Sequence, residues 1–280
     1  AIGYFNTKVN YDILYYLPGD IDTMKGQDIL LDDFGKGAYA MVVVDGMNKK
    51  NVSELVKKVE KVDHVASVIS YNGIVGDGVP AEILPDKFRS YFENDDSGAT
   101  LFAIFFDDTT SSTETMDAIE ELRDVTDKQC YIAGMSAVVT DTKSMSEKET
   151  PIYVLVAVLL VCVVLAIFMD SFLVPVLFMV SIGMAIVYNL GTNIFLGEVS
   201  YITKALAAVL QLGVTLDYSI FLWHSYKEEK EKNPDDHKEA MAVAIGNTLT
   251  SVVGSSITTV AGFIALCFMS FTLGLDLGIV

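Results

Sequence analysis

The stretch PIYVLVAVLLVCVVLAIFM, residues Pro151–Met169, carries no charged side chain and is long enough to cross a bilayer as one helix. A hydrocarbon core of roughly 30 Å needs about 20 apolar helical residues to span it. Residues 151–280 hold 5 of the 19 Lys and Arg residues and 10 of the 37 Asp and Glu residues, so most of the charge lies before this stretch. We therefore expect an α+β protein with an acidic soluble domain over residues 1–150 and a membrane domain over residues 151–280.

The apolar pattern continues from this first span toward the C-terminus. It predicts three further complete spans and the beginning of another. Lysines gather in the polar stretch 224–244, whereas the short connection between the second and third spans has no Lys or Arg. The positive-inside rule then places residues 224–244 in the cytoplasm and residues 1–150 outside the cell membrane. The further spans are expected at residues 173–197, 199–223 and 245–271, with the next beginning at 273–280.

The soluble part alternates between strand-like and helix-like segments. Strand segments are rich in β-branched and aromatic residues, and the helical segments have apolar residues on one face with Lys and Glu on the other. The order is β-α-β-β-α-β, which predicts a ferredoxin-like sandwich. The strands are expected at residues 38–46, 64–74, 99–108 and 129–137, and the helices at 51–62 and 112–126.

Composition excludes several classes of function. The net charge of −18 argues against a nucleic-acid partner, because phosphates are neutralised by clustered Lys and Arg. The three cysteines form neither a disulfide framework nor a metal-binding spacing. Nucleophile elbows and phosphate loops are also missing from the sequence, so we expect no enzyme, no cofactor and no metal. The chain begins at Ala1 and stops inside an apolar stretch, which we interpret as a fragment of a longer protein.

The third span contains an aspartate at hydrocarbon depth. Asp217 lies about six residues, or roughly 9 Å along a helix, from the polar end at His224. A charge near the bilayer centre costs at least about 2.5–3.5 kcal/mol. The carboxyl is therefore either protonated or turned toward a polar interior between helices. A carboxyl that binds and releases a proton there is what a proton-coupled transporter needs.

The fourth span offers hydroxyl partners for this carboxyl. Its sequence NTLTSVVGSSITTVAGF includes Ser255, Ser256, Thr258 and Thr259. Small and hydroxylated residues suit close helix packing with interhelical hydrogen bonds. Two interpretations stay open: Asp217 takes part in proton transfer, or it locks two helices together by hydrogen bonding.

These two spans resemble a known family. GVTLDYSIFLWHSYKEE resembles the fourth transmembrane helix of MMPL-type transporters of the RND (resistance–nodulation–division) superfamily, through Gly213, Asp217 and Tyr218. The family's usual arginine at the helix end is replaced by Lys227. The stretch from Ala240 to Leu266 resembles the next helix. NYDILYYLPGD is similar to the segment after the first helix, and TLGLDLGIV to the start of the sixth.

The resemblance implies an exporter driven by the proton-motive force, with a βαββαβ porter domain outside the cell membrane. Asp217 and Tyr218 map onto the family's proton-relay pair, and Gly213, Ser255, Ser256, Thr258 and Thr259 onto relay support and helix packing. The implied partners are the lipid bilayer, protons, and a lipid or other hydrophobic substrate. A complete transporter has two halves, so a second half is also implied, as a missing C-terminal half or another protomer.

Two other functions compete with export. Sterol-sensing domains share this helix arrangement and the Gly-x-x-x-Asp motif, which leaves open a lipid-binding or sensing protein without proton-coupled flux. A membrane-anchored enzyme is the least supported, because the soluble part lacks a recognisable catalytic constellation.

Overall fold

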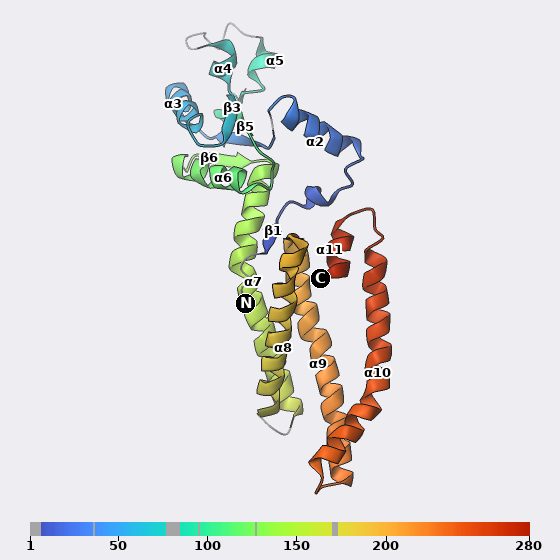
Figure 1. Ribbon diagram of the computed structural model, residues 1–280. Helices are drawn as coiled ribbons and strands as arrows, with labels where there is room; N and C mark the ends of the chain where they lie inside the picture. The colour runs from blue at the N-terminus through green and yellow to red at the C-terminus, as the bar shows by residue number, and fades with distance from the viewer. Residues whose placement is uncertain (1–6, 36, 77–84, 95, 127, 170–172) are drawn as a thin grey trace. The chain divides into compact units, whose positions relative to one another are not determined.

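A computed structural model describes residues 7–280 apart from residues 36, 77–84, 95, 127 and 170–172 (Figure 1). The chain divides into two compact units. Residues 17–145 form the sheet unit, and the residues up to Tyr16 together with residues 146–280 form the helical unit. The sequence predicts a single division at residue 150. However, residues 7–16 group with the helices rather than with the sheet, and residues 1–6 lie outside the described part of the chain.

The sheet unit is built on strands whose alternate residues enter one core. Side chains of a strand point to opposite faces in turn, so one face of each central strand is buried. On β2, Tyr39 and Met41 point the other way and are exposed. The buried residues are Ala40, Val42 and Val44 in β2 (Tyr39–Val44) and Phe102, Ile104 and Phe106 in β5 (Ala99–Phe106).

The strands form one antiparallel sheet in the order β3-β5-β2-β6, and the short β4 also pairs with β5. The register places Ala40 opposite Ile104 and Val42 opposite Phe102. Residues directly opposite on neighbouring strands share a face, so these buried side chains pack against one another. The remaining strands are β3 (Val65–Ile69), β4 (Glu93–Asn94) and β6 (Cys130–Ala133).

Two amphipathic helices, α3 (Lys49–Val59) and α6 (Thr113–Val125), add their apolar faces to the same core. Each begins at a capping side chain: Asn48 accepts a hydrogen bond from a backbone N–H of α3, and Ser112 accepts one from α6. Each buried Leu, Ile or Val side chain contributes about 1.5–3 kcal/mol. Shorter helices are α2 (Asp22–Asp32), α4 (Tyr71–Val75) and α5 (Asp86–Arg89).

Gly134 ends β6 immediately before the long helix α7 (Met135–Phe168). Its φ is +111°, and a Cβ there would lie 3.2 Å from Ala40 Cα, so glycine suits the position. The strand expected at 129–137 is therefore shorter, and the helix begins well before the span expected from residue 151. Met, Lys and Glu in residues 135–150 favour helix, which explains why the polar stretch joins the apolar one.

Among the residues that the structure describes, four helices that lie wholly or mostly in the helical unit are long and apolar enough to cross a membrane, as the sequence predicts for a multi-pass protein. A two-stranded parallel sheet of β1 and β7 lies at one end of the helical unit. The elements besides α7 are β1 (Lys8–Asn10), the 3₁₀ helices η1 (Ile13–Tyr16) and η3 (Asn193–Leu196), β7 (Glu198–Ser200), α8 (Leu173–Thr192), α9 (Tyr201–Lys232), α10 (His237–Leu266) and α11 (Leu273–Ile279).

The expectation of a loop over residues 224–244 is wrong in its local structure. Both flanking helices extend into it, and the residues between them are 233–236. Lys and Glu are good helix formers, so the polar composition that ends an apolar span does not end a helix. Asp236 then starts α10, because its carboxylate accepts hydrogen bonds from the N–H groups of Lys238 and Glu239 at 3.0 Å each.

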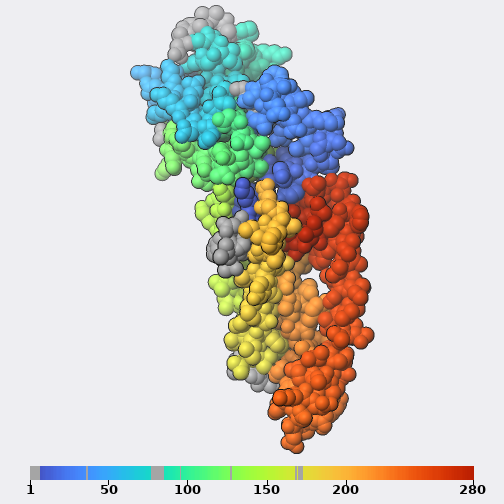
Figure 2. All heavy atoms as spheres, in the orientation of Figure 1, coloured from blue at the N-terminus to red at the C-terminus, as the bar shows by residue number. Residues whose placement is uncertain are grey.

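In Figure 2, α9 is visible between α8 and α10, and it makes contacts with both. At one end of the bundle, Leu165, Met169 and Val174 form a small buried cluster with residues of α9. Helix α11 packs closely on α10 through two glycines. A Cβ at Gly274 or Gly278 would come within 2.6 Å of a carbonyl oxygen of α10 or its end. Small residues let helices approach in this way where lipid supplies no hydrophobic drive.

Candidate functional site

Helix α9 carries the aspartate and tyrosine singled out in the sequence. Ser200 caps this helix by accepting a hydrogen bond from the Ile202 N–H. Asp217 is exposed on the surface of this chain, and Tyr218 next to it is half-buried against α10. The two neighbouring side chains therefore have different surroundings, one open and one packed.

The tyrosine makes the contact between α9 and α10. Ser256 Oγ donates a hydrogen bond to the Tyr218 hydroxyl at 3.2 Å, and Ser255 and Thr259 lie beside the same hydroxyl. Thr258 and Thr259 also donate back to the Ser255 carbonyl of their own helix, at 2.8 and 3.1 Å. The structure thus brings three of the predicted hydroxyl residues, Ser255, Ser256 and Thr259, to Tyr218, whereas the Thr258 hydroxyl bonds to its own helix.

The hydroxyls do not reach the aspartate. Within the described residues, no hydrogen bond or ion pair joins the Asp217 carboxylate to another side chain. On α9 itself, the two nearby polar side chains bond to each other: Gln211 Nε2 donates to Thr215 Oγ1 at 3.0 Å. The expectation that α10 hydroxyls hold this carboxyl is therefore not met inside this chain.

Asp217 belongs to an open face of α9. Gly213 is one helical turn before it, and a Cβ at Gly213 would meet nothing within 4 Å. Leu210, Val214 and Phe221 are exposed along the same helix. On α10, the exposed residues include Val253, Ile257 and Val260. We call the strip of Leu210, Gly213, Val214, Asp217 and Phe221 the open α9 face.

At the other end of α9, sequence reasoning missed a buried carboxylate. Glu229 is 9% exposed and accepts a hydrogen bond from Lys232 Nζ at 2.7 Å, with Asn247 Nδ2 of α10 at 3.5 Å. Tyr226 and His237 also approach, with 3.3 Å between the tyrosine oxygen and Nδ1. These contacts join the polar ends of α9 and α10. A buried glutamate inside a Lys/Glu-rich stretch has no distinctive sequence signal.

A second missed cluster lies where residues 8–16 meet the starts of α9 and α11. Asn10, Asp12 and Tyr16 are each no more than 5% exposed. Burial raises the pKa of the Asp12 carboxyl, although a hydrogen bond from the Leu14 N–H opposes this. Burial, with the nearby Glu147 carboxylate, raises the pKa of Tyr11 to about 12.

The helical unit also holds a cavity of about 550 Å³ between α7, α8 and α9. Apolar side chains form most of its wall. Tyr11, Glu147, Tyr201 and Lys204 supply its polar part, and the rings of Tyr11 and Tyr201 stack with centroids 5.6 Å apart. A cavity of this composition can take an amphiphilic molecule with a polar end.

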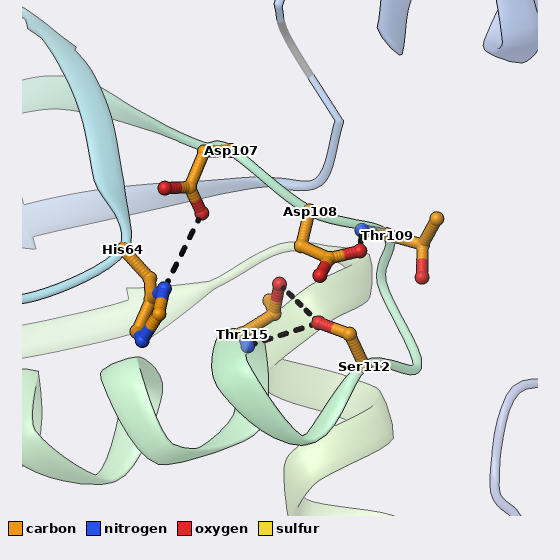
Figure 3. Close-up of polar contacts among 6 residues, drawn as sticks. All are labelled: His64, Asp107, Asp108, Thr109, Ser112 and Thr115. Atoms are coloured by element: carbon orange, nitrogen blue, oxygen red, sulfur yellow. Dashed lines mark hydrogen bonds and ion pairs between the residues drawn. The ribbon is translucent and has the colours of Figure 1, made fainter.

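The polar contacts of the sheet unit have local roles (Figure 3). His64 Nδ1 lies 3.6 Å from Asp107 Oδ1 at the surface. Asp108 accepts a hydrogen bond from the Thr109 N–H, and Ser112 caps α6 by accepting one from the Thr115 N–H at 3.0 Å. No group of three or more His, Cys, Asp or Glu side chains able to hold a metal occurs among the residues that the structure describes.

Comparisons with known proteins agree on the type of protein. A sequence model of the MMPL family matches residues 17–280. A protein of Methanocaldococcus jannaschii named as a membrane protein, MJ1562, is 25% identical over 249 residues, covering 82% of this chain and 64% of that protein. A protein of Streptomyces coelicolor that is also named as a membrane protein, SCO5905, is 24% identical over 271 residues, covering 89% of this chain and 31% of that protein.

The solved structures include a crystal structure of SecDF in a super-membrane-facing form, with a TM-score of 0.40 and 15% identity. It covers 87% of this chain and 30% of SecDF. The chain spans less than two thirds of the length of these two relatives. With a family match over nearly the whole sequence and four helices able to cross a bilayer, this chain is a multi-pass membrane protein that belongs to the MMPL family.

Proposed function

We propose that the chain is part of an RND-type exporter in the cell membrane. The proton-motive force drives it, and it moves lipids or other hydrophobic compounds. Asp217 and Tyr218 form its proton relay. The observation that carries this proposal is an ionisable carboxyl inside a helix that is apolar enough to span the membrane. Such groups are costly in lipid and mark ion and proton pathways.

The relay works through the difference between the two side chains. Asp217, on the open α9 face, takes up and releases the proton. Tyr218 contacts Ser256 of α10, so a change at Asp217 alters the packing of α9 on α10 at the adjacent residue. A carboxylate cannot face lipid cheaply, so a second transporter half covers the open α9 face. Gly213 leaves room for its close approach.

We assign the soluble domain, residues 1–150 in the sequence-based division, as a ferredoxin-like porter domain outside the cytoplasm. Support comes from its strand order β6-β2-β5-β3, fully antiparallel, with α3 and α6 packed into one core with the sheet. The Lys-rich end of α9 and α10 supports a cytoplasmic position for residues 224–244. The remaining residues, 151–280, form the membrane domain.

The test is proton uptake by the intact protein in proteoliposomes, followed with an enclosed pH-sensitive dye under an imposed gradient. Asp217→Asn removes the titratable group at nearly constant shape, and we expect it to abolish protein-dependent uptake with unchanged membrane insertion. Asp235→Asn, on the exposed polar turn, is the matched control. Full uptake by Asp217→Asn would contradict the relay. Lipid binding without any proton uptake by the wild type would favour the sterol-sensing-like alternative.

A further inference from the structure

Residues 8–16 join the two units and are tied to the start of α9. Strand β1 pairs in parallel with β7, which places Asn10 opposite Ser200. The helical unit's N-terminal segment ends at Tyr16, and the sheet unit begins at Leu17. Any displacement of Tyr16 is therefore passed through one peptide bond to the first residue of the sheet unit.

Local hydrogen bonds hold the turn in this segment. Asn10 Oδ1 accepts a hydrogen bond from the Asp12 N–H at 2.8 Å, and Asp12 Oδ1 accepts one from the Leu14 N–H at 2.8 Å. Both side chains are buried, with 3% and 4% exposed. Side-chain to backbone bonds of this type fix a turn locally.

Tyr16 makes the contacts that end this segment. Its carbonyl accepts two hydrogen bonds from Thr272, from the N–H and from Oγ1, each at 3.0 Å. Its hydroxyl bonds to Ser200 and Asp276, and Asp276 Oδ2 accepts the Ser200 N–H at 2.7 Å. We call Tyr16, Ser200, Thr272 and Asp276 the clasp. Burial, together with the Asp276 carboxylate, raises the pKa of Tyr16, so its hydroxyl stays a donor.

The clasp is connected to both helices of the proposed relay, α9 and α10. Ser200 is the N-cap of α9, which carries Asp217 and Tyr218. Asp276 lies on α11, which is packed on α10 through glycines, and α10 carries Ser256. A shift of α9 against α10 therefore changes the separation of Ser200 from Asp276. Tyr16 bonds to both and must move with one of them.

We infer that Tyr16 and Asp276 are positioning residues of transport, which convert a movement of α9 against α10 into a movement of the sheet unit. This inference rests on the proposed proton-coupled function. The bonds to the Asp276 carboxylate are charge-assisted and part-buried, and Thr272 adds two neutral bonds to the Tyr16 carbonyl, so together they hold the segment to the helices during such a shift.

The experiment uses spin labels on the intact protein in liposomes, in a background with the three native cysteines replaced by alanine. A label at position 28, on the exposed side of α2, reports the sheet unit, and one at position 253 of α10 reports the helices. Acidification is the stimulus, and neither label requires a known substrate. Wild type, Tyr16→Phe, Asp276→Asn and the control Tyr15→Phe are compared. Tyr15 is 55% exposed and packs edge-on against Tyr16.

The clasp predicts that both labels respond to acidification in the wild type and in Tyr15→Phe. In Tyr16→Phe and Asp276→Asn the response at 253 persists, and the response at 28 is reduced, because the bonds from Thr272 to the Tyr16 carbonyl remain. An unchanged response at 28 in both variants, or loss of both responses together, would overturn it. Absence of a response at 253 in the wild type, or its survival in Asp217→Asn, would instead contradict the proposed function.

Discussion

Each of the two units of this chain is stabilised internally by different forces. In the sheet unit, Phe102, Ile104 and Ile119 are at most 1% exposed and form one continuous apolar core. In the helical unit, long apolar side chains such as Ile167 and Leu173 are 72% and 66% exposed. Burial of apolar side chains from water stabilises the sheet unit. In the helical unit, lipid solvates the apolar surface, so close packing and polar contacts determine how its helices associate.

This contrast explains where the polar contacts of the helical unit occur. They are concentrated at three levels: the clasp at one end, Tyr218 with Ser256 along the span, and Glu229 with Lys232 and Asn247 at the other end. Elsewhere, few hydrogen bonds between α9 and α10 occur among the residues that the structure describes. Changes at these levels are therefore expected to alter helix movement, whereas changes in the sheet core are expected to alter stability.

A matched pair of phenylalanine truncations should show the largest difference in stability between the two units. Phe102→Ala in the sheet core should cost about 3–5 kcal/mol, because it removes transfer energy and leaves a cavity. Phe195→Ala, at a position 87% exposed in the helical unit, should cost roughly 0.5 kcal/mol or less. Hydrogen exchange of β2 and β5 amides measures the first, and of η3 and β7 amides the second. Equal destabilisation by the two substitutions would show that burial of apolar side chains from water contributes alike to both units.

A pair of glycine substitutions should change stability by a smaller amount, and in the sheet unit alone. Gly134→Ala places a Cβ at positive φ close to Ala40, and should destabilise the sheet unit by about 1–3 kcal/mol. Gly213→Ala meets nothing inside this chain and should leave its stability unchanged.

Because we propose that a second half covers the open α9 face, Gly213→Ala should nevertheless lower proton uptake in the proteoliposome assay. Hydrogen exchange measures stability for both variants. Normal uptake by Gly213→Ala would argue against close packing on that face.

Much of this fold follows from local patterns. Uncharged runs such as Pro151–Met169 predict spans, and runs rich in β-branched and aromatic residues such as β2 predict strands, because both signals depend on neighbouring residues. The polar parts of α7, α9 and α10 are not predicted as helix, because a polar stretch beside an apolar run marks the end of the membrane span but not the end of the helix. The pairing of β1 with β7 joins residues almost 200 positions apart, and local patterns do not contain it.

The candidate site also combines features that local sequence patterns predict with features that depend on distant residues. Asp217 is conspicuous because a charge in an apolar run is rare, and a hydroxyl-rich partner helix is visible in the sequence. Which residue those hydroxyls reach is decided by the rotation of α10, and they reach Tyr218 rather than Asp217. The clasp residues come from three distant segments. Alone, each is an ordinary tyrosine, serine, threonine or aspartate.

The most direct measurement is the protonation of Asp217 itself, by infrared difference spectroscopy of the intact protein in lipid on acidification. A carboxyl that titrates inside the bilayer gives a band of its protonated form. We predict a band that disappears in Asp217→Asn and persists in Asp235→Asn. A carboxyl band that is unchanged in Asp217→Asn would mean that this aspartate takes up no proton, which would contradict the relay.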